Sequence, residues 1–333
     1  MTIPWLRILS MTVNSPRMYA AEDRIEPADG VTRVDLAELI ALRARAGKPG
    51  VHAIRKRTPL AGGHASAVRG RGMDYAESRI YQAGDDSRNI DWRRTARSGK
   101  WHTKLFQAER ERSLLLLLDT HATMRFGTRA RYKSVAAARA AAWLAWTCIR
   151  SGDRVGAMAF GRVRAAVDPQ AGTRGVLTVL GAVARWDGLD RSDAGASGEA
   201  LSTAVTRARR MAAPGSQVWL LSDGWCTDAA ASQAFARIAR HVDLRVIIPV
   251  DPLEHASAPE GCYLFETASG KRRVDASTAT ARATLRDRLA QGWRRLADTC
   301  DEASVPWTKL TTTDEPDVVL APFWRARSGN RRA

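Results

Sequence analysis

The sequence predicts an α/β fold in which helices flank a mostly parallel sheet, preceded by a smaller β-rich segment. Three observations support this fold class. Apolar runs of strand length, such as SLLLLLD and SQVWLLSD, have the composition of strands buried on both faces. Alanine-rich stretches of helical length, such as YKSVAAARAAAWLAW, alternate with them. The segment from 62 to 112 is instead rich in Gly, Arg and Asp and holds only short extended pieces.

The elements follow one another in a regular order. DLAELIALRARAG, from Asp35, predicts a helix with Asp35 as N-cap and Glu38 completing a capping box. After Ser113, the pattern predicts strands at 113–119, 154–161, 162–169, 216–224, 243–251, 262–267, 272–277 and 305–313. It predicts helices at 132–153, 173–186, 198–215, 228–241, 278–303 and 315–324. The expected organisation is a tail and helix (1–50), a β-rich segment (51–112), an α/β domain (113–325) and a basic tail (326–333).

Composition limits the function classes. The chain has 333 residues, 45% of them hydrophobic, which is enough for a packed core. Its formal net charge of +17 makes an acidic partner such as nucleic acid a working hypothesis. Only 7 of the 52 basic residues are lysine, so a general arginine bias is the competing explanation.

Cysteine usage and hydropathy indicate a cytoplasmic protein. The four cysteines are far apart and form no C-x-x-C pair, so neither a disulfide framework nor a zinc module is expected. No stretch reaches the roughly 18 to 20 apolar residues of a membrane span. The sequence also lacks a P-loop and an H-E-x-x-H motif, which argues against two large enzyme classes.

Two predicted buried strands end in an aspartate, Asp119 and Asp223. Ligands bind at the carboxyl ends of the strands in sheets of this type. We therefore expect both carboxylates at one functional rim. On chemistry alone, Asp119 is equally explained as a cap of the turn that follows, and His121 as a solvent-facing loop residue.

The densest group of charged and aromatic side chains lies in RIYQAGDDSRNIDWRRTAR. It is read either as a catalytic or phosphate-binding cluster, or as a loop tied by Arg–carboxylate pairs. The structural interpretation predicts that Arg79 or Arg88 pairs with Asp85, Asp86 or Asp91. The candidate interaction residues are Arg79, Tyr81, Gly84, Asp85, Asp86, Arg88, Asp91, Trp92 and Arg97.

This stretch resembles the signature of the domain of unknown function 58 family. The matching residues are RIYQAGDDSRNIDW, then Ala96-Arg97, Lys104-Leu105-Phe106 and Glu109, then the strand ending in Asp119. The resemblance implies a von Willebrand factor type A-like (Rossmann-like) domain after the signature. It also implies association with MoxR-type AAA+ ATPases.

Type A domains commonly hold Mg²⁺ or Mn²⁺ in a metal-ion-dependent adhesion site with oxygen ligands. The resemblance places Asp119, His121, Thr123, Glu199 and Asp223 at the five ligand positions. His121 and Glu199 stand where the family has hydroxyl side chains, and imidazole suits Zn, Cu or Ni better than Mg²⁺. We therefore expect a degenerate site without a tightly bound cation. An intact Mg²⁺ site and a His/Asp/Glu site for another metal remain as alternatives.

The leading functional hypothesis is a non-enzymatic adaptor that works with a MoxR-type ATPase and an unknown client protein. The first alternative is nucleic-acid binding driven by the basic charge. The second is a metal-dependent hydrolase that uses Asp85, Asp86 and Asp91.

Overall fold

The computed structural model describes residues 7–8, 28–46, 73–82, 85, 87–108, 113–189, 198–256, 258–267 and 270–325. The chain divides into two compact units. The larger comprises Met1–Val51 and Arg112–Ala333, and the smaller comprises His52–Glu111. The predicted basic tail at 326–333 lies outside the described residues.

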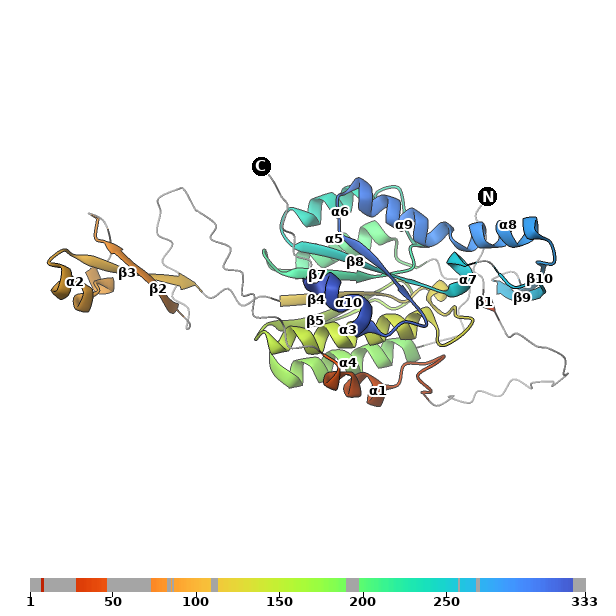
Figure 1. Ribbon diagram of the computed structural model, residues 1–333, viewed down its shortest axis with the longest axis horizontal. Helices are drawn as coiled ribbons and strands as arrows, with labels where there is room; N and C mark the ends of the chain where they lie inside the picture. The colour runs from red at the N-terminus through yellow and green to blue at the C-terminus, as the bar shows by residue number, and fades with distance from the viewer. Residues whose placement is uncertain are drawn as a thin grey trace. The chain divides into compact units, whose positions relative to one another are not determined.

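A six-stranded sheet forms the centre of the larger unit (Figure 1). Its order is β11-β8-β7-β4-β5-β6, and only β6 runs antiparallel to its neighbour. The strands are β4 (Ser113–Asp119), β5 (Arg154–Phe160), β6 (Ala165–Gln170), β7 (Gln217–Leu221), β8 (Asp243–Val250) and β11 (Trp307–Thr311). When the six strands are numbered in chain order, the sheet has the doubly wound order 3-2-1-4-5-6. The chain adds strands outward on one side of β4 and then on the other, so the order switches sides between the parallel neighbours β4 and β7. The predicted fold class, and the pairing of the two aspartate-ending strands, are confirmed.

The leucine run in β4 explains why this strand is central. Leu114, Leu116 and Leu118 belong to one hydrophobic cluster, and Leu115 and Leu117 belong to a second. Successive side chains of a strand point to opposite faces, so every leucine is buried by helices on one side or the other. The first cluster includes residues of α1 (Leu36–Ala41), α3 (Lys133–Arg150), α4 (Gly172–Gly188) and α10 (Pro316–Arg325). The second includes residues of α5 (Leu201–Met211), α6 (Ala231–Ala239) and α9 (Gln291–Glu302).

The N-terminal helix α1 begins at its predicted cap, because the Asp35 carboxylate accepts a hydrogen bond from the backbone N–H of Ala37. The Glu38 carboxylate does not complete the predicted capping box. It pairs instead with the buried guanidinium of Arg139 in α3. That guanidinium also bonds Glu315, with 2.5 Å between Nη2 and Oε2. One arginine of the central helix thus holds residues from both ends of the larger unit.

The predicted long helix from 278 to 303 is wrong in one respect. It is two helices, α8 (Ala279–Leu289) and α9, separated at Ala290. The break lets each helix cover a different cluster. Leu285 and Leu289 pack in a third cluster with Phe265, whereas residues of α9 pack on the sheet. This third cluster also draws on α7 (Pro252–His255) and on β9 (Cys262–Thr267), which pairs with β10 (Gly270–Asp275) and β1 (Arg7–Ile8).

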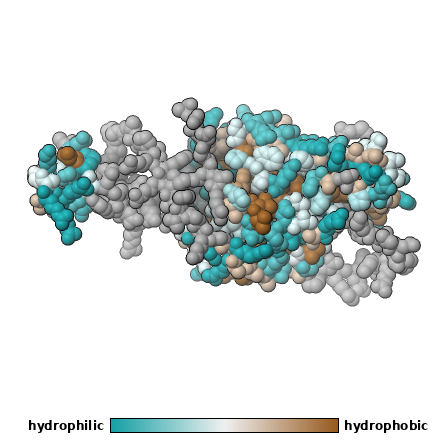
Figure 2. Space-filling view, in the orientation of Figure 1, coloured by the Kyte–Doolittle hydropathy of each residue, from teal (hydrophilic) through white to brown (hydrophobic). Residues whose placement is uncertain are grey.

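The smaller unit contains an antiparallel pair, β2 (Met73–Ile80) and β3 (His102–Ala108), and the short helix α2 (Trp92–Ser98). The helix ends at Gly99, which adopts a left-handed conformation with φ 67°. Figure 2 shows mostly hydrophilic side chains on the visible face of this unit.

Within the described residues, no helix has both the length and the apolar character required to cross a lipid bilayer.

Candidate functional site

The candidate site lies where the sheet order reverses. Asp119 is the last residue of β4, and Asp223 follows the neighbouring strand β7 by two residues. In doubly wound sheets this edge is the usual ligand-binding position. The structure therefore brings the two strand-end aspartates to the same rim.

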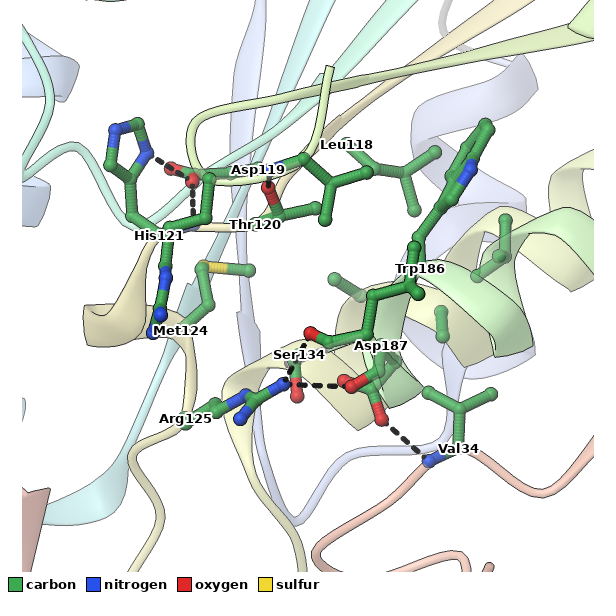
Figure 3. A pocket seen from close by; sticks show the side chains of 16 residues that line it. Val34, Leu118, Asp119, Thr120, His121, Met124, Arg125, Ser134, Trp186 and Asp187 are labelled. Carbon is green, nitrogen blue, oxygen red and sulfur yellow. Dashed lines mark hydrogen bonds and ion pairs between the residues drawn. The ribbon is translucent and has the colours of Figure 1, made fainter. Parts of the chain in front are cut away.

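Asp119 and His121 form a buried ion pair (Figure 3). The imidazole Nδ1 lies 2.6 Å from Oδ1 of Asp119, which also accepts the backbone N–H of His121 at 2.8 Å. Burial alone would lower the pKa of His121, but the Asp119 carboxylate outweighs it and holds the pKa above its usual value. Burial alone would raise the pKa of Asp119, and the same pairing holds it below its usual value. The pairing therefore favours the imidazolium form of His121 next to an ionised Asp119.

The second oxygen of Asp119 is also occupied. Oδ2 accepts hydrogen bonds from the Ser222 hydroxyl at 2.6 Å and from the Cys226 thiol at 3.4 Å. Burial, reinforced by Asp119, raises the pKa of the Cys226 thiol well above its usual value. A protonated thiol is a poor nucleophile. The ligand atoms of Asp119, His121 and Cys226 nevertheless lie within 4.8 Å of one another, close enough to share one metal ion.

The imidazole of His121 fits between two glycines. A Cβ atom on Gly198 would lie 2.1 Å from Nε2, and one on Gly161 would lie 2.7 Å from Nδ1. Phe160 makes an edge contact with the ring, with 5.9 Å between the centroids. The interpretation of His121 as a solvent-facing loop residue is wrong, because only 4% of its side chain is exposed.

Asp223 pairs with a lysine that the sequence did not indicate. Its Oδ2 lies 2.7 Å from Nζ of Lys133, and its Oδ1 accepts the Thr123 hydroxyl at 3.3 Å. The same ammonium lies 2.9 Å from Oε1 of Glu254. Glu254 is held in place by a capping box, because its Oε2 accepts the backbone N–H of Asp251 at 2.9 Å.

Two carboxylates share this one ammonium. Burial alone would lower the pKa of Lys133, but Asp223 and Glu254 raise it above its usual value, so the ammonium stays charged. Burial raises the pKa of Glu254 to about 7, although Lys133 opposes the change. Lys133 is therefore a permanent cation, and Glu254 is the group that takes up a proton first.

Glu199, expected at the threonine position of a metal site, pairs with an arginine. Nη2 of Arg207 lies 2.7 Å from Oε2, and Nε lies 3.2 Å from Oε1, which makes a two-point contact. Arg164 adds a longer contact of 3.6 Å. Only 3% of the glutamate side chain is exposed.

These contacts decide whether the residues fit a divalent cation. Mg²⁺ and Mn²⁺ need free, ionised oxygen ligands in near-octahedral geometry. Here the three expected carboxylates are each neutralised by a cation of the same chain: His121 for Asp119, Lys133 for Asp223 and Arg207 for Glu199. The donor set does not fit the metal site that the family resemblance implies.

A small cavity of about 40 Å³ borders Asp119 on the side of α4 (Figure 3). Trp186 and other apolar side chains line it, together with Arg125 and Arg162. Arg125 is anchored by the backbone carbonyl of Asp187 at 2.8 Å, and the Asp187 carboxylate accepts the backbone N–H of Val34 at 2.9 Å. The cavity has room for at least one water molecule, and the network beside it joins the segment before α1 to the rim.

The His121–Asp119 pair predicts a pH dependence of stability. The stabilisation from a raised histidine pKa is fully present below the ordinary value of about 6.5 and is lost as pH rises through the folded-state value. We expect the unfolding free energies of the wild type and His121→Gln to differ most near pH 6 and to converge by pH 9. Urea unfolding across this range measures the difference.

The protonation of Glu254 changes the unfolding free energies of the wild type and of His121→Gln equally, so it cancels in the difference between them. His241→Gln, which changes an exposed imidazole, is the matched control and should show no such convergence. A constant difference between wild type and His121→Gln from pH 6 to 9 would show that His121 stays neutral in the folded protein.

The signature residues of the smaller unit are tied mainly to one another. Arg79 pairs with Asp85, with 2.6 Å between Nη2 and Oδ1, so the predicted arginine–aspartate pairing is present. The Tyr81 hydroxyl donates to the backbone carbonyl of Asp85 at 3.2 Å. Asp91 is the N-cap of α2 and accepts the Ser78 hydroxyl at 2.5 Å. These carboxylates therefore stabilise the loop and the helix start.

The remaining signature residues have different positions. Trp92, Arg88 and Arg97 are exposed, and the rings of Trp92 and Tyr81 both lie close to Trp101, with centroids 6.2 and 6.1 Å away. Gly84 and Asp86 lie outside the described residues.

Sequence reasoning missed four residues of the rim: Ser222, Cys226, Lys133 and Glu254. Ser222 directly precedes Asp223 at a strand end, so its position was a usable signal. The other three are single polar residues in or beside helical or loop patterns, and nothing in their local sequence distinguishes them.

Comparison with known proteins gives a family and no activity. Residues 77–297 match the family described as "Protein of unknown function DUF58". The uncharacterized proteins Rv1480 of Mycobacterium tuberculosis and Mb1516 of Mycobacterium bovis are each 34% identical over 152 residues, or 45% of this chain and 47% of theirs. The chain thus spans about half the length of the curated relatives it matches.

Among solved structures, BatB from Bacteroides thetaiotaomicron aligns with a TM-score of 0.41 and 15% identity, covering 62% of this chain and 94% of BatB. A von Willebrand factor type A protein from Catenulispora acidiphila aligns with a TM-score of 0.33 and 16% identity, covering 58% and 44% of the two chains. The family match spans most of the chain, from the signature strand β2 to helix α9, and on that basis the chain belongs to the DUF58 family.

Proposed function

We propose that the chain is a non-enzymatic, cytoplasmic adaptor that binds a MoxR-type AAA+ ATPase and presents a client protein to it. The observation that carries the proposal is an exposed aromatic–arginine surface on the smaller unit, formed by Tyr81, Trp92, Trp101 and the arginines of α2. Trp92 is 65% exposed and Trp101 is 56% exposed. Tryptophan, tyrosine and arginine are the side chains that most often dominate binding energy at protein interfaces.

The charge around these rings favours an acidic partner surface. Arg93, Arg94 and Arg97 are exposed on α2, and among the described residues their guanidinium groups have no ion-pair partner. Among the described residues, the carboxylates nearest in sequence already have partners: Asp85 pairs with Arg79, and Asp91 accepts the Ser78 hydroxyl. The surface therefore offers apolar area and unsatisfied positive charge together.

The rim of the larger unit supports a role without catalysis. Its carboxylates are paired with internal cations, and its thiol is held protonated. The hydrolase alternative uses Asp85, Asp86 and Asp91. Asp86 lies outside the described residues, and Asp85 and Asp91 each accept hydrogen bonds within the signature segment. We therefore do not favour that alternative.

The test is to measure, by isothermal titration, the affinity of the protein for the MoxR-type ATPase of the source organism. We expect Trp92→Ala combined with Trp101→Ala to weaken binding roughly 30-fold, because truncated hot-spot residues typically cost about 2 kcal/mol or more. Val318→Ala, which removes apolar surface from the larger unit at a side chain 71% exposed, is the control and should bind normally. Equal affinities of the double variant and the wild type would contradict the proposal.

Nucleic-acid binding is a second candidate, favoured by the same arginines beside exposed tryptophans. The discriminating measurement is the affinity of the wild type for a single-stranded oligonucleotide as a function of salt. The logarithm of the binding constant should then fall steeply and linearly with the logarithm of the salt concentration. If this salt dependence is lost in the double variant Arg93→Gln/Arg97→Gln, the result favours nucleic acid over an ATPase as the partner.

A further inference from the structure

Lys133 is an unusual residue for its position. It is the first residue of α3, where the helix dipole disfavours a positive charge, and only 1% of its side chain is exposed. The ring of Phe126 lies 5.3 Å from the ammonium and covers it. A buried lysine is retained in such a place only when carboxylates compensate it, and Asp223 and Glu254 do so at 2.7 and 2.9 Å.

The contacts of Asp223 leave little room for a second cation. One carboxylate oxygen accepts the ammonium, and the other accepts the Thr123 hydroxyl and the backbone N–H of Trp225, the latter at 3.2 Å. The family resemblance places Asp223 and Thr123 at two of the metal-ligand positions. A divalent ion bound to Asp223 would have to displace the ammonium of Lys133, whose side chain is only 1% exposed.

We infer that Lys133 is the resident cation at the Asp223 side of this rim, an internal ammonium that supplies the positive charge a divalent ion supplies in a metal-dependent adhesion site. The rim is therefore assembled without metal, and contacts made on it require none. This inference concerns the larger unit alone and stands whether or not the proposed ATPase partner is correct.

Removing the ammonium should create a metal requirement. In Lys133→Ala the Asp223 and Glu254 carboxylates face a vacated space beside the Thr123 hydroxyl, which is an oxygen-only ligand set. At pH 8 we expect the variant to melt roughly 10 °C below the wild type, because the two buried carboxylates lose the cation that they share. We expect 1 mM Mn²⁺ or Mg²⁺ to restore most of that loss in the variant and to leave chelator-treated wild type unchanged.

The control is Lys133→Ala/Glu254→Gln, in which one of the two facing carboxylates is removed. It should melt above Lys133→Ala in the presence of chelator and gain little from Mn²⁺. Lys271→Ala, at an exposed lysine of β10, accounts for any general effect of losing one positive charge.

Two measurements can overturn the inference. Isothermal titration that shows micromolar binding of Mn²⁺ to chelator-treated wild type, lost in Asp119→Ala, would mean that the rim accepts a metal with Lys133 in place. A folded Lys133→Ala that melts with the wild type, or that is destabilised but insensitive to both ions, would mean that the ammonium does not act as the cation. If Lys133→Ala does not fold, the wild-type titration decides alone.

Discussion

Asp119→Ala should destabilise the protein by about 3–5 kcal/mol, the usual cost of removing one side of a buried ion pair. The carboxylate accepts four hydrogen bonds: two from His121, one from Ser222 and one from Cys226. Its loss leaves a buried imidazolium without a counter-charge and a buried hydroxyl without its acceptor. Urea unfolding at pH 6, where His121 is charged, measures the effect.

Ser222→Ala is the matched control because it removes a neutral donor from the same carboxylate. The Ser222 hydroxyl donates to Asp119 and accepts the backbone N–H of Gly224 at 3.1 Å. Each hydrogen bond contributes about 1 kcal/mol, so this variant should lose about 2 kcal/mol, less than Asp119→Ala. If Asp119→Ala and Ser222→Ala lowered the free energy of unfolding by the same amount, the Asp119–His121 ion pair would add no stability beyond the hydrogen bonds. Asp119 would then be an ordinary turn cap.

Gly198→Ala should also be strongly destabilising, at the upper end of the 1–3 kcal/mol typical of an overpacked site. The new methyl group would lie 2.1 Å from Nε2 of His121, well inside van der Waals contact. The imidazole cannot move away easily, because Gly161 also lies against the ring and Asp119 holds it through Nδ1. Thermal and urea unfolding of the variant measure the cost.

A double-mutant cycle isolates the cause. In a His121→Ala background the space next to Gly198 is vacant, so adding Gly198→Ala should cost less than about 1 kcal/mol. A full cost in that background would place the strain in the backbone around Gly198 instead of in the contact with the imidazole.

The arrangement of strands could be predicted because each strand has a strong local signal. The leucines of β4 and the VWLL core of β7 are continuous apolar runs, and an aspartate at the end of such a run lies at the carboxyl edge of the sheet. The division of 278–303 into two helices was missed although Gly292 follows the break at Ala290 by two residues, because a single glycine is tolerated inside a helix. The break is needed because residues of α8 pack in the third hydrophobic cluster and residues of α9 pack in the second, on the sheet.

The chemistry of the rim could be predicted only in part. Asp119 and Asp223 were expected there, but their partners lie far away in sequence or look ordinary. Lys133 is 90 residues from Asp223 and 121 from Glu254, and a lysine at the start of a helix is normally solvated. The local pattern identifies the carboxylates but does not reveal which cation of the chain is folded against them.

The pairing of Arg139 with both Glu38 and Glu315 has a consequence for how the protein folds during synthesis. Its guanidinium joins Glu38, near the start of the larger unit, to Glu315, which also pairs with Arg45 and Arg131. During synthesis, Arg139 leaves the ribosome long before Glu315, so its charge lacks half of its compensation while the sheet is being built. The contacts of Arg139 are therefore complete only after residue 315 has been synthesised, and a nascent chain stalled before that residue would hold an arginine that lacks its second carboxylate.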